Sequence, residues 1–303
     1  MAAYYCVFSS SRKLQILAAS TYIITVLAII ILNRRKTRGL LISLICFLGV
    51  ALWFTSISPK ADSIYPDHLK MPYAEIDGSL VTIHNVRNCD YRIPEDFDVH
   101  YETRTYDLEK LQTMDLLMNY WEYELIAHTF LSFGFSDGQY LTLSIEFRPE
   151  TNDTYGMFKG LYKQYELIYI WADERDLVRL RTNYRKENVF LYRVQLPPRD
   201  ARKLFMCMLE RTNNLYARPE FYNTAVQSCT NTIGHHIDRS GLADLPWWKR
   251  SLLTGLVDKR SYNRGWLDTS RPFSELKKDA FITDRGLTAD KDPDFSRKIR
   301  THL

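Results

Sequence analysis

Two uncharged apolar segments near the N-terminus constrain the architecture of this chain more than any other feature. Residues 14–33 carry no charged side chain, and a second uncharged stretch runs from residue 39 to residue 59. Each is long enough to cross a hydrocarbon core of roughly 30 Å. We therefore predict that residues 1–60 form a two-helix transmembrane hairpin, with helices at about residues 14–33 and 39–58.

The loop between these segments sets the expected orientation. It carries the basic residues Arg34, Arg35, Lys36 and Arg38. Short cytoplasmic loops are enriched in Lys and Arg, so the turn is expected inside the cell and everything after Lys60 outside. A cleaved signal peptide is the alternative for the first segment. Its apolar run is longer than an h-region and no small-residue cleavage site follows, which favours retained anchors.

Residues 61–303 show no repeat, linker or low-complexity tract and are expected to form one domain with a polar C-terminal extension. The chain has 40 basic and 36 acidic residues, a net charge of +4, so it lacks the basic excess of a nucleic-acid-binding protein. Five cysteines without a CxxC spacing are too few for a disulfide scaffold, and an odd total leaves at least one thiol free.

Mixed periodicity in the domain indicates an α+β fold with an antiparallel sheet. Residue Asp107 resembles an N-cap, and the 3–4 spacing of the apolar residues that follow predicts a helix whose stripe comprises Leu108, Leu111, Met114, Leu117 and Trp121. Strands are expected at 79–85, 166–171 and 189–194, and helices at 173–184 and 200–213. The charge run at 173–176 could be a site, but such a run is usually the solvated face of a helix.

The best-defined local element is a β-hairpin of residues 125–135 and 140–147, joined by the turn signal Ser136-Asp137-Gly138-Gln139. The period of two places the apolar residues of the second strand on one face. Thr142, Ser144 and Glu146 lie on the other. A polar face therefore lies beside the first strand.

A candidate nucleophile follows from its local sequence. The chain has no GxSxG, phosphate-binding glycine loop, HExxH or GxGxxG motif. Cys229 lies among small polar residues that suit a helix N-terminus, with Ser228 as the expected N-cap. A thiol there has a lowered pKa because the helix dipole and free N–H groups stabilise the thiolate, and the same N–H groups could hold an oxyanion.

Among the domain's histidines, His128 is the best candidate for the base because it lies within an apolar strand, where both ring nitrogens need partners. Ser144 and Glu146 on the adjacent strand are candidate orienting groups. A two-residue turn would place His128 opposite Phe147, whereas a three-residue loop would place it opposite Glu146. A lone His and a lone Cys are also common as core residues, and that alternative stays open.

No cofactor or metal is expected. Adjacent helical residues such as His235 and His236 point about 100° apart, and nothing nearby completes a ligand set. Cys89 and Cys207 are interpreted as small buried hydrophobes. Trp247, Trp248 and Trp266 could line a rim that faces lipid or could belong to the core.

Three motifs resemble the Lnb N-terminal periplasmic domain family. They are residues 126–135 around His128, residues 143–148 around Glu146, and Pro219-Glu220-Phe221-Tyr222-Asn223-Thr224 with Cys229. The likeness runs from about Pro72 to Ile299-Arg300. It implies a permuted papain-like or NlpC-like thiol enzyme in which Cys229 is the nucleophile, His128 the base, and Glu146 or Ser144 the orienting residue.

The resemblance also implies a location and an activity. The location is the bacterial inner membrane, with the main domain facing the periplasm. The activity is transfer of a phospholipid acyl chain to an amine, the N-terminus of a lipoprotein in the family's named representative, so membrane lipids and lipoproteins are the expected partners. A thiol amidase or peptidase acting on cell-envelope peptides and a non-enzymatic interaction module are the alternatives. An apolar trough beside Cys229 would favour acyl transfer, and a polar open cleft would favour hydrolysis.

Overall fold

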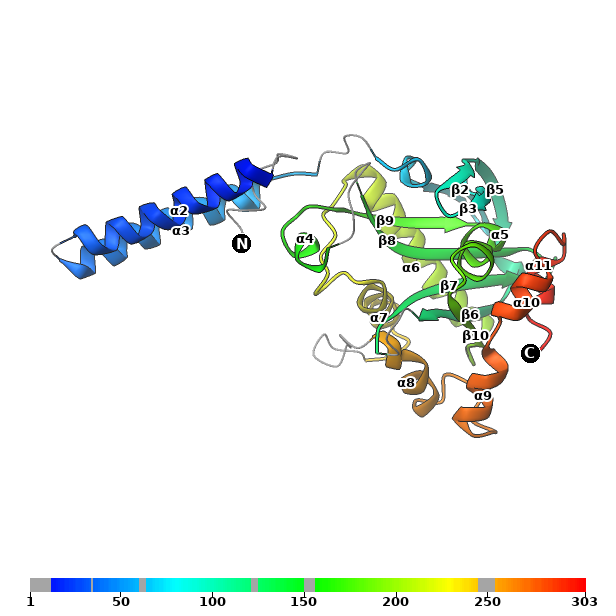
Figure 1. The fold of residues 1–303 in the computed structure, drawn as a ribbon. Helices are drawn as coiled ribbons and strands as arrows, with labels where there is room; N and C mark the ends of the chain where they lie inside the picture. Colours follow the sequence, from blue (N-terminus) through cyan, green and yellow to red (C-terminus); the bar gives the residue numbers. More distant parts are fainter. Residues whose placement is uncertain (1–11, 34, 60–63, 121–124, 150–155, 245–253) are drawn as a thin grey trace.

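The computed structural model in Figure 1 describes residues 12–33, 35–59, 64–120, 125–149, 156–244 and 254–303. Two long N-terminal helices, α2 (Arg12–Leu32) and α3 (Lys36–Ser56), form an antiparallel hairpin that projects from an α+β domain. Leu17, Ile24 and Leu52 are among the many apolar side chains that stand exposed on the hairpin. Both helices are long and apolar enough to cross a membrane, which is consistent with the predicted anchoring.

Close packing inside the hairpin occurs at Gly39, the buried residue of α3. A Cβ atom at this position would lie 3.1 Å from the carbonyl oxygen of Ile29 on α2. Glycine therefore lets the two backbones approach each other where α3 begins.

One lysine connects the hairpin to the domain. The Nζ atom of Lys163 donates to the carbonyl oxygens of Phe54 at 2.7 Å, Ile57 at 3.3 Å and Thr55 at 3.4 Å. These carbonyls belong to the end of α3, where the helix leaves its last acceptors unpaired and its dipole is negative. The ammonium group also lies over the ring of Phe221 in the domain, 5.3 Å from its centroid.

The domain is built on an eight-stranded sheet in the order β1-β2-β9-β8-β7-β6-β10, with β5 paired to β2. Its strands are β1 (Tyr73–Asp77), β2 (Leu80–Arg87), β5 (Tyr101–Asp107), β6 (Leu111–Tyr120), β7 (Ala127–Phe135), β8 (Tyr140–Arg148), β9 (Glu166–Ala172) and β10 (Asn188–Arg193). A separate two-stranded sheet pairs β3 (Asp90–Ile93) with β4 (Asp96–Asp98). The large sheet is mixed, because β2 and β9 run parallel at Arg87 and Ala172. The expectation of a purely antiparallel sheet is therefore corrected.

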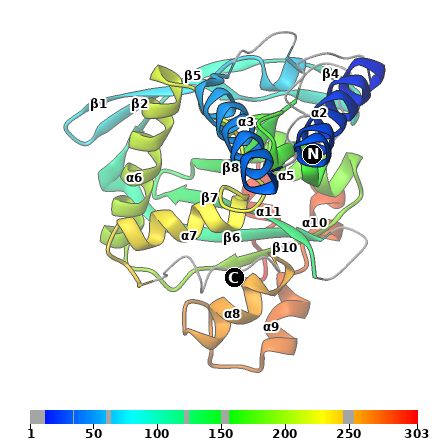
Figure 2. The same cartoon turned by 90° about the vertical axis from the view of Figure 1, so that its left-hand side faces the viewer.

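Both faces of the sheet are covered, as Figure 2 shows. One face packs against α6 (Pro198–Ala217), α7 (Cys229–Arg239), α8 (Val257–Asn263) and α9 (Phe273–Ala280). The other packs against α5 (Glu174–Arg179), α10 (Thr283–Thr288) and α11 (Phe295–Lys298). The remaining helical elements are α4 (Met157–Leu161), the 3-10 turns η1 (Pro66–His68), η2 (Leu108–Lys110) and η5 (Thr254–Leu256), and the π-helical turn η3 (Leu180–Tyr184), which continues α5.

The helix predicted after Asp107 is wrong. Asp107 does cap a helical turn, accepting from the N–H of Glu109 at 3.0 Å, but that turn is only the 3-10 segment η2. The chain then continues as β6, whose residues from Met114 to Tyr120 are all buried. A strand covered on both faces is apolar without alternation, so its sequence contains a helix-like spacing by chance. Trp121 lies outside the described residues.

Buried ion pairs occupy the α5 side of the sheet. Arg300 bonds to Asp115 at 2.8 Å and makes two contacts with Glu174. Arg87 forms a bidentate pair with Asp176, at 2.8 and 2.9 Å. Glu174 and Asp176 are fully buried, so the interpretation of the 173–176 charge run as a solvated face is wrong.

The C-terminal segment contributes to the same layer. Phe295 and Ile299, from the stretch expected as a polar extension, are fully buried in a cluster with Leu117 and Phe130 of the sheet. Arg300 therefore reaches Asp115 and Glu174 from a part of the chain that packs as an integral layer of the domain.

Candidate active site

The β7–β8 hairpin places His128 beside the polar face of β8. The N–H of Phe135 donates to the carbonyl oxygen of Gln139 at 2.9 Å, which closes a three-residue loop, and Gly138 within it has a φ of +86°. In this register Leu131 pairs with Leu143. Continued along the strands, it sets His128 level with Glu146, as the three-residue alternative predicted.

The imidazole of His128 contacts both candidate orienting residues. Its Nε2 atom lies 2.7 Å from Oγ of Ser144 and 3.1 Å from Oε1 of Glu146. Ser144 donates its own proton to Oε1 of Glu146 at 2.7 Å. The ring packs on Phe130, with centroids 5.8 Å apart. The three polar side chains therefore form one connected cluster, in which His128 and Ser144 are buried and Glu146 is partly exposed.

Arg181, which the sequence reasoning missed, fixes the carboxylate of that cluster. Its Nη2 donates to Oε1 of Glu146 at 2.9 Å, Nε donates to Asn119 at 3.2 Å, and Nη1 donates to the carbonyl oxygen of Leu177 at 2.9 Å. The guanidinium carbon also lies 4.8 Å from the ring centroid of Phe130. Because Arg181 comes from the π-helical turn η3, no local signal around residue 128 or 146 could reveal it.

Cys229 is the first residue of α7, as predicted. The hydroxyl of Ser228 accepts from the N–H of Asn231 at 3.4 Å and caps the helix. Register pairing between β7 and β8 ends at Leu131 and Leu143, and the backbone of Thr129 on the β7 segment beyond that point contributes to lowering the pKa of the Cys229 thiol. The imidazole of His128 is near enough to the thiol to lower its pKa through its charge. A helix on one face of the sheet thus begins near an imidazole whose partners, Ser144 and Glu146, lie on the other face.

Electrostatics favour the charged forms of both groups. Burial lowers the pKa of His128, but Glu146 and then Cys229 outweigh burial and raise that pKa from 6.5 to about 9. Burial raises the pKa of the Cys229 thiol, but His128 and the N–H of Thr129 bring it below its ordinary value. Burial raises the pKa of Glu146, yet His128 and Arg181 hold it well below its usual range. The arrangement supports a thiolate beside an imidazolium.

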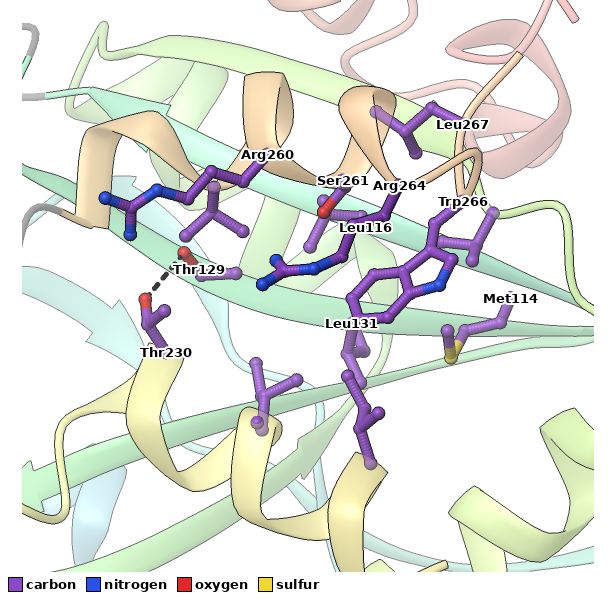
Figure 3. Close-up of a pocket in the computed structure, with 15 residues that line it drawn as sticks. Met114, Leu116, Thr129, Leu131, Thr230, Arg260, Ser261, Arg264, Trp266 and Leu267 are labelled. Atoms are coloured by element: carbon purple, nitrogen blue, oxygen red, sulfur yellow. Dashed lines mark hydrogen bonds between the residues drawn. The ribbon is translucent and has the colours of Figure 1, made fainter. Parts of the chain in front are cut away.

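An apolar pocket begins one residue from this pair. Thr230, the residue after Cys229, donates its hydroxyl proton to Oγ1 of Thr129 at 3.1 Å, and both side chains line one end of the pocket (Figure 3). The Oγ1 atom of Thr230 is 3.9 Å from the Cys229 sulfur. The space measures about 800 Å³, including the part open to solvent. Apolar residues from β6, β7, α7, α8 and the segment after α8 form most of its wall, namely Met114, Leu116, Leu131, Ile233, Ile237, Val257 and Leu267.

The other cysteines of the domain, and Trp266, lie outside the cluster of His128, Ser144 and Glu146. Cys89 is buried, whereas Cys207 on α6 is partly exposed and sits 3.3 Å from Nδ1 of His236. Burial lowers the pKa of His236 to about 3, so the imidazole in the pair Cys207–His236 is neutral, unlike the imidazole of His128 beside Cys229. Among the described residues no group of three His, Cys, Asp or Glu side chains could hold a metal ion. Trp266 lines the pocket, and Trp247 and Trp248 fall outside the described residues.

The cluster has the elements of nucleophilic catalysis. It provides a thiolate of lowered pKa, an imidazolium able to give up a proton, and an anionic residue that holds the imidazole. The N–H groups of Cys229 and Thr230 belong to the first turn of α7, where helical N–H groups lack intrahelical acceptors and can stabilise an oxyanion.

Comparison with known proteins gives one result. A sequence model of the Lnb N-terminal periplasmic domain matches residues 97–255, a range that includes His128, Ser144, Glu146 and Cys229. No curated protein and no solved structure matches the chain significantly.

Proposed function

The chain belongs to the Lnb N-terminal periplasmic domain family, and from this premise and the geometry of its site we propose that it is a membrane-anchored, periplasmic cysteine-dependent acyltransferase. Its donor is the ester of a phospholipid and its acceptor an amine, such as the N-terminus of a lipoprotein. Cys229 is the nucleophile, His128 the proton carrier, and Glu146 the residue that orients and charges the imidazole. Ser144 supports the same ring nitrogen.

One observation carries this proposal: an apolar pocket ends at Thr129 and Thr230, and the hydroxyl of Thr230 lies 3.9 Å from the Cys229 sulfur. The walls contributed by β6, β7 and α7 suit an acyl chain, whose burial is favourable by about 0.8 kcal/mol per methylene group. A peptide substrate would instead need backbone partners and polar subsites along the cleft. The pocket therefore favours acyl transfer over the amidase or peptidase alternative.

The first half-reaction forms a thioester. The sulfur of Cys229 attacks the ester carbonyl carbon, and the resulting oxyanion is stabilised by the first-turn N–H groups of α7. The bond from this carbon to the ester oxygen breaks as His128 gives its proton to the departing alkoxide, which leaves as a lysophospholipid. Since Ser144 and Glu146 occupy Nε2, Nδ1 is the nitrogen available for this transfer.

The second half-reaction regenerates the thiolate. A neutral amine attacks the thioester carbon, the carbon–sulfur bond breaks, and His128 takes the proton released by the nitrogen. The product is an amide, with Cys229 again a thiolate beside an imidazolium. Water in place of the amine would release a fatty acid, which is the hydrolytic alternative.

A relationship to papain-like and NlpC-like enzymes is part of the proposal. In this chain the histidine strand precedes the cysteine helix, which is the permuted order. The thiol at a helix N-terminus, packed on a sheet whose strand bears the histidine, supports this relationship. The hairpin contributes by holding the site near membrane-borne donors and acceptors, which raises their effective concentration without additional contacts.

Intact-mass analysis of the full chain purified from membranes tests the proposal. We expect an acyl adduct on the wild-type protein that hydroxylamine removes, because thioesters react with hydroxylamine. The adduct should be missing in Cys229→Ala and retained in Cys207→Ala, a matched control that removes the partly exposed thiol on α6.

Reconstitution with phospholipid vesicles and a lipopeptide amine then identifies the acceptor. Formation of the amide and lysophospholipid in equal amounts supports transfer. Release of free fatty acid without formation of the amide would instead identify the enzyme as a hydrolase. If the masses of wild type and Cys229→Ala differ only by the substitution, and neither amide nor free fatty acid is formed, both the transferase and the hydrolase activity are refuted.

A further inference from the structure

We propose that Arg260 and Arg264 bind the phosphate of the donor lipid and thereby make the enzyme specific for phosphate-bearing lipids. This inference rests on the proposed function and names the residues that read the polar part of the substrate. Both arginines line the apolar pocket, the first on α8 and the second directly after it. Residues four apart share one face of a helical segment, so the two guanidinium groups work on the same side.

The direction of the two side chains is visible in Figure 3. Both extend from α8 toward the end of the pocket formed by Thr129 and Thr230, which is the end beside the nucleophile. The two guanidinium groups therefore lie near the end of the pocket at which an acyl chain would approach the thiolate. An anion bound there would have the rest of its molecule directed into the apolar space.

These arginines also lack the partners that occupy other arginines of the domain. Arg87, Arg181 and Arg300 each pair with a carboxylate. Within the described residues neither Arg260 nor Arg264 has an ion pair, and Arg264 contacts the ring of Trp266 at 5.3 Å. The carboxylate of α8, Asp258, is turned into the core, where it accepts from Tyr120 and Tyr192 at 2.8 and 2.9 Å. The positive charges of Arg260 and Arg264 are thus available to an external anion.

Substrate chemistry explains the placement. In a glycerophospholipid only the glycerol carbons separate the phosphate from the ester carbonyls, so a phosphate held near Thr129 and Thr230 brings an ester close to Cys229. Arginine forks match phosphate oxygens in a bidentate manner, and such charge-assisted bonds are strong. Phosphate binding at the mouth and chain binding in the pocket together orient the ester toward the sulfur.

Kinetics with the full chain in vesicles test the assignment. We compare Arg260→Gln, Arg264→Gln and the double variant with Lys259→Gln, which removes one charge from an exposed position of the same helix outside the pocket. With phosphatidylglycerol as donor, the double variant should lose about 10- to 100-fold in kcat/KM, mainly through KM. With diacylglycerol, which has the same chains and no phosphate, it should match wild type, and Lys259→Gln should match wild type with both donors.

A binding measurement separates this inference from the proposed activity. Two proteins in detergent are compared by calorimetry: the full chain with Cys229→Ser, and the same chain that also carries Arg260→Gln and Arg264→Gln. Each is titrated with short-chain phosphatidylglycerol below its micelle concentration, and separately with glycerol 3-phosphate, which has the phosphate but no acyl chains. Tighter binding of the lipid than of glycerol 3-phosphate, lost in the double variant, supports the assignment even if no acyl transfer occurs. Equal affinity of both proteins for the lipid, or an equal loss in Lys259→Gln, would overturn it.

Discussion

Removing the charge of Glu146 gives the sharpest test of the site, because this carboxylate is what keeps His128 protonated. Glu146→Gln preserves the length of the side chain and leaves an amide oxygen that can still accept from Ser144 and Arg181. Arg181 also keeps its bonds to Asn119 and to the Leu177 carbonyl oxygen. The substitution therefore changes the charge while most of the hydrogen-bond framework stays in place.

The size of the effect follows from the pKa of His128. The increase from 6.5 to about 9 corresponds to about 3 kcal/mol at 1.36 kcal/mol per pH unit. Burial opposes this increase, the charge of Glu146 is its largest single source, and the charge of Cys229 is the next. Without the carboxylate the pKa of His128 falls, because burial then has only Cys229 to oppose it, and the neutral imidazole gains population at pH 7. The thiolate then loses its cation, and we expect a decrease of about 10- to 100-fold in thiolate population at that pH.

Alkylation by iodoacetamide as a function of pH measures this population directly, since the thiolate is the reactive form. Peptide mass spectrometry resolves each cysteine. In wild type Cys229 should react at a lower pH than Cys207, whose pKa is raised by burial, and in Glu146→Gln its profile should move to higher pH. Cys89, buried with its pKa raised to about 12, should stay unreactive in both and thus report an intact fold.

Ser144→Ala is the matched control because it removes the other partner of Nε2 without changing charge. Glu146 remains within reach of the imidazole, so only one hydrogen bond is lost, worth about 1 kcal/mol, and the alkylation profile should move little. The reasoning is refuted if Glu146→Gln leaves the profile of Cys229 unchanged while Cys89 is still protected. A larger displacement in Ser144→Ala than in Glu146→Gln would assign the orienting role to Ser144 instead.

Three further predictions concern stability. Because the pKa of His128 is raised above its unfolded value of 6.5, the protonated imidazole stabilises the fold below pH 6.5, and this contribution is lost as pH rises through about 9. Urea denaturation at pH 7 and pH 10 should therefore show a lower free energy of unfolding at pH 10 in wild type, and His128→Asn should lack this decrease. Arg300→Met leaves Glu174 as a buried carboxylate without an ion-pair partner and Asp115 paired only to Arg193, and should lower the free energy of unfolding by about 3–5 kcal/mol, measured by chemical denaturation. Ser228→Ala removes the cap of α7 and should cost about 1 kcal/mol in the same measurement, whereas Ser228→Asp should retain the cap.

Local spacing was sufficient to predict the parts of the site that lie close together in sequence. A hairpin register depends on the turn and on the alternation of its two strands, so placing His128 beside Glu146 reduced to a choice between two loop lengths. The N-cap Ser228 and the start of α7 at Cys229 were readable for the same reason, because capping involves only the adjacent turn.

Long-range partners were beyond that reasoning. Asp176 pairs with Arg87 from 89 positions earlier, and Glu174 pairs with Arg300 from 126 positions later, so a charge run that looks solvated in sequence is buried in the fold. Arg181 enters the site through a π-helical turn, and Arg260 enters the pocket from α8, neither of which has a sequence signal tied to residue 128. The misassigned β6 shows that burial on both faces removes the alternation by which strands are recognised.

The contact between Lys163 and the end of α3 has a mechanical consequence. A domain joined to its anchor by a free chain would tumble and present every side to the bilayer in turn. Here one ammonium group binds three carbonyl oxygens that close the anchor helix, and its own residue belongs to the domain. These bonds oppose rotation about the joint, so in the proposed membrane-anchored protein the tilt of the helical pair would also determine which surface of the domain faces the lipid headgroups.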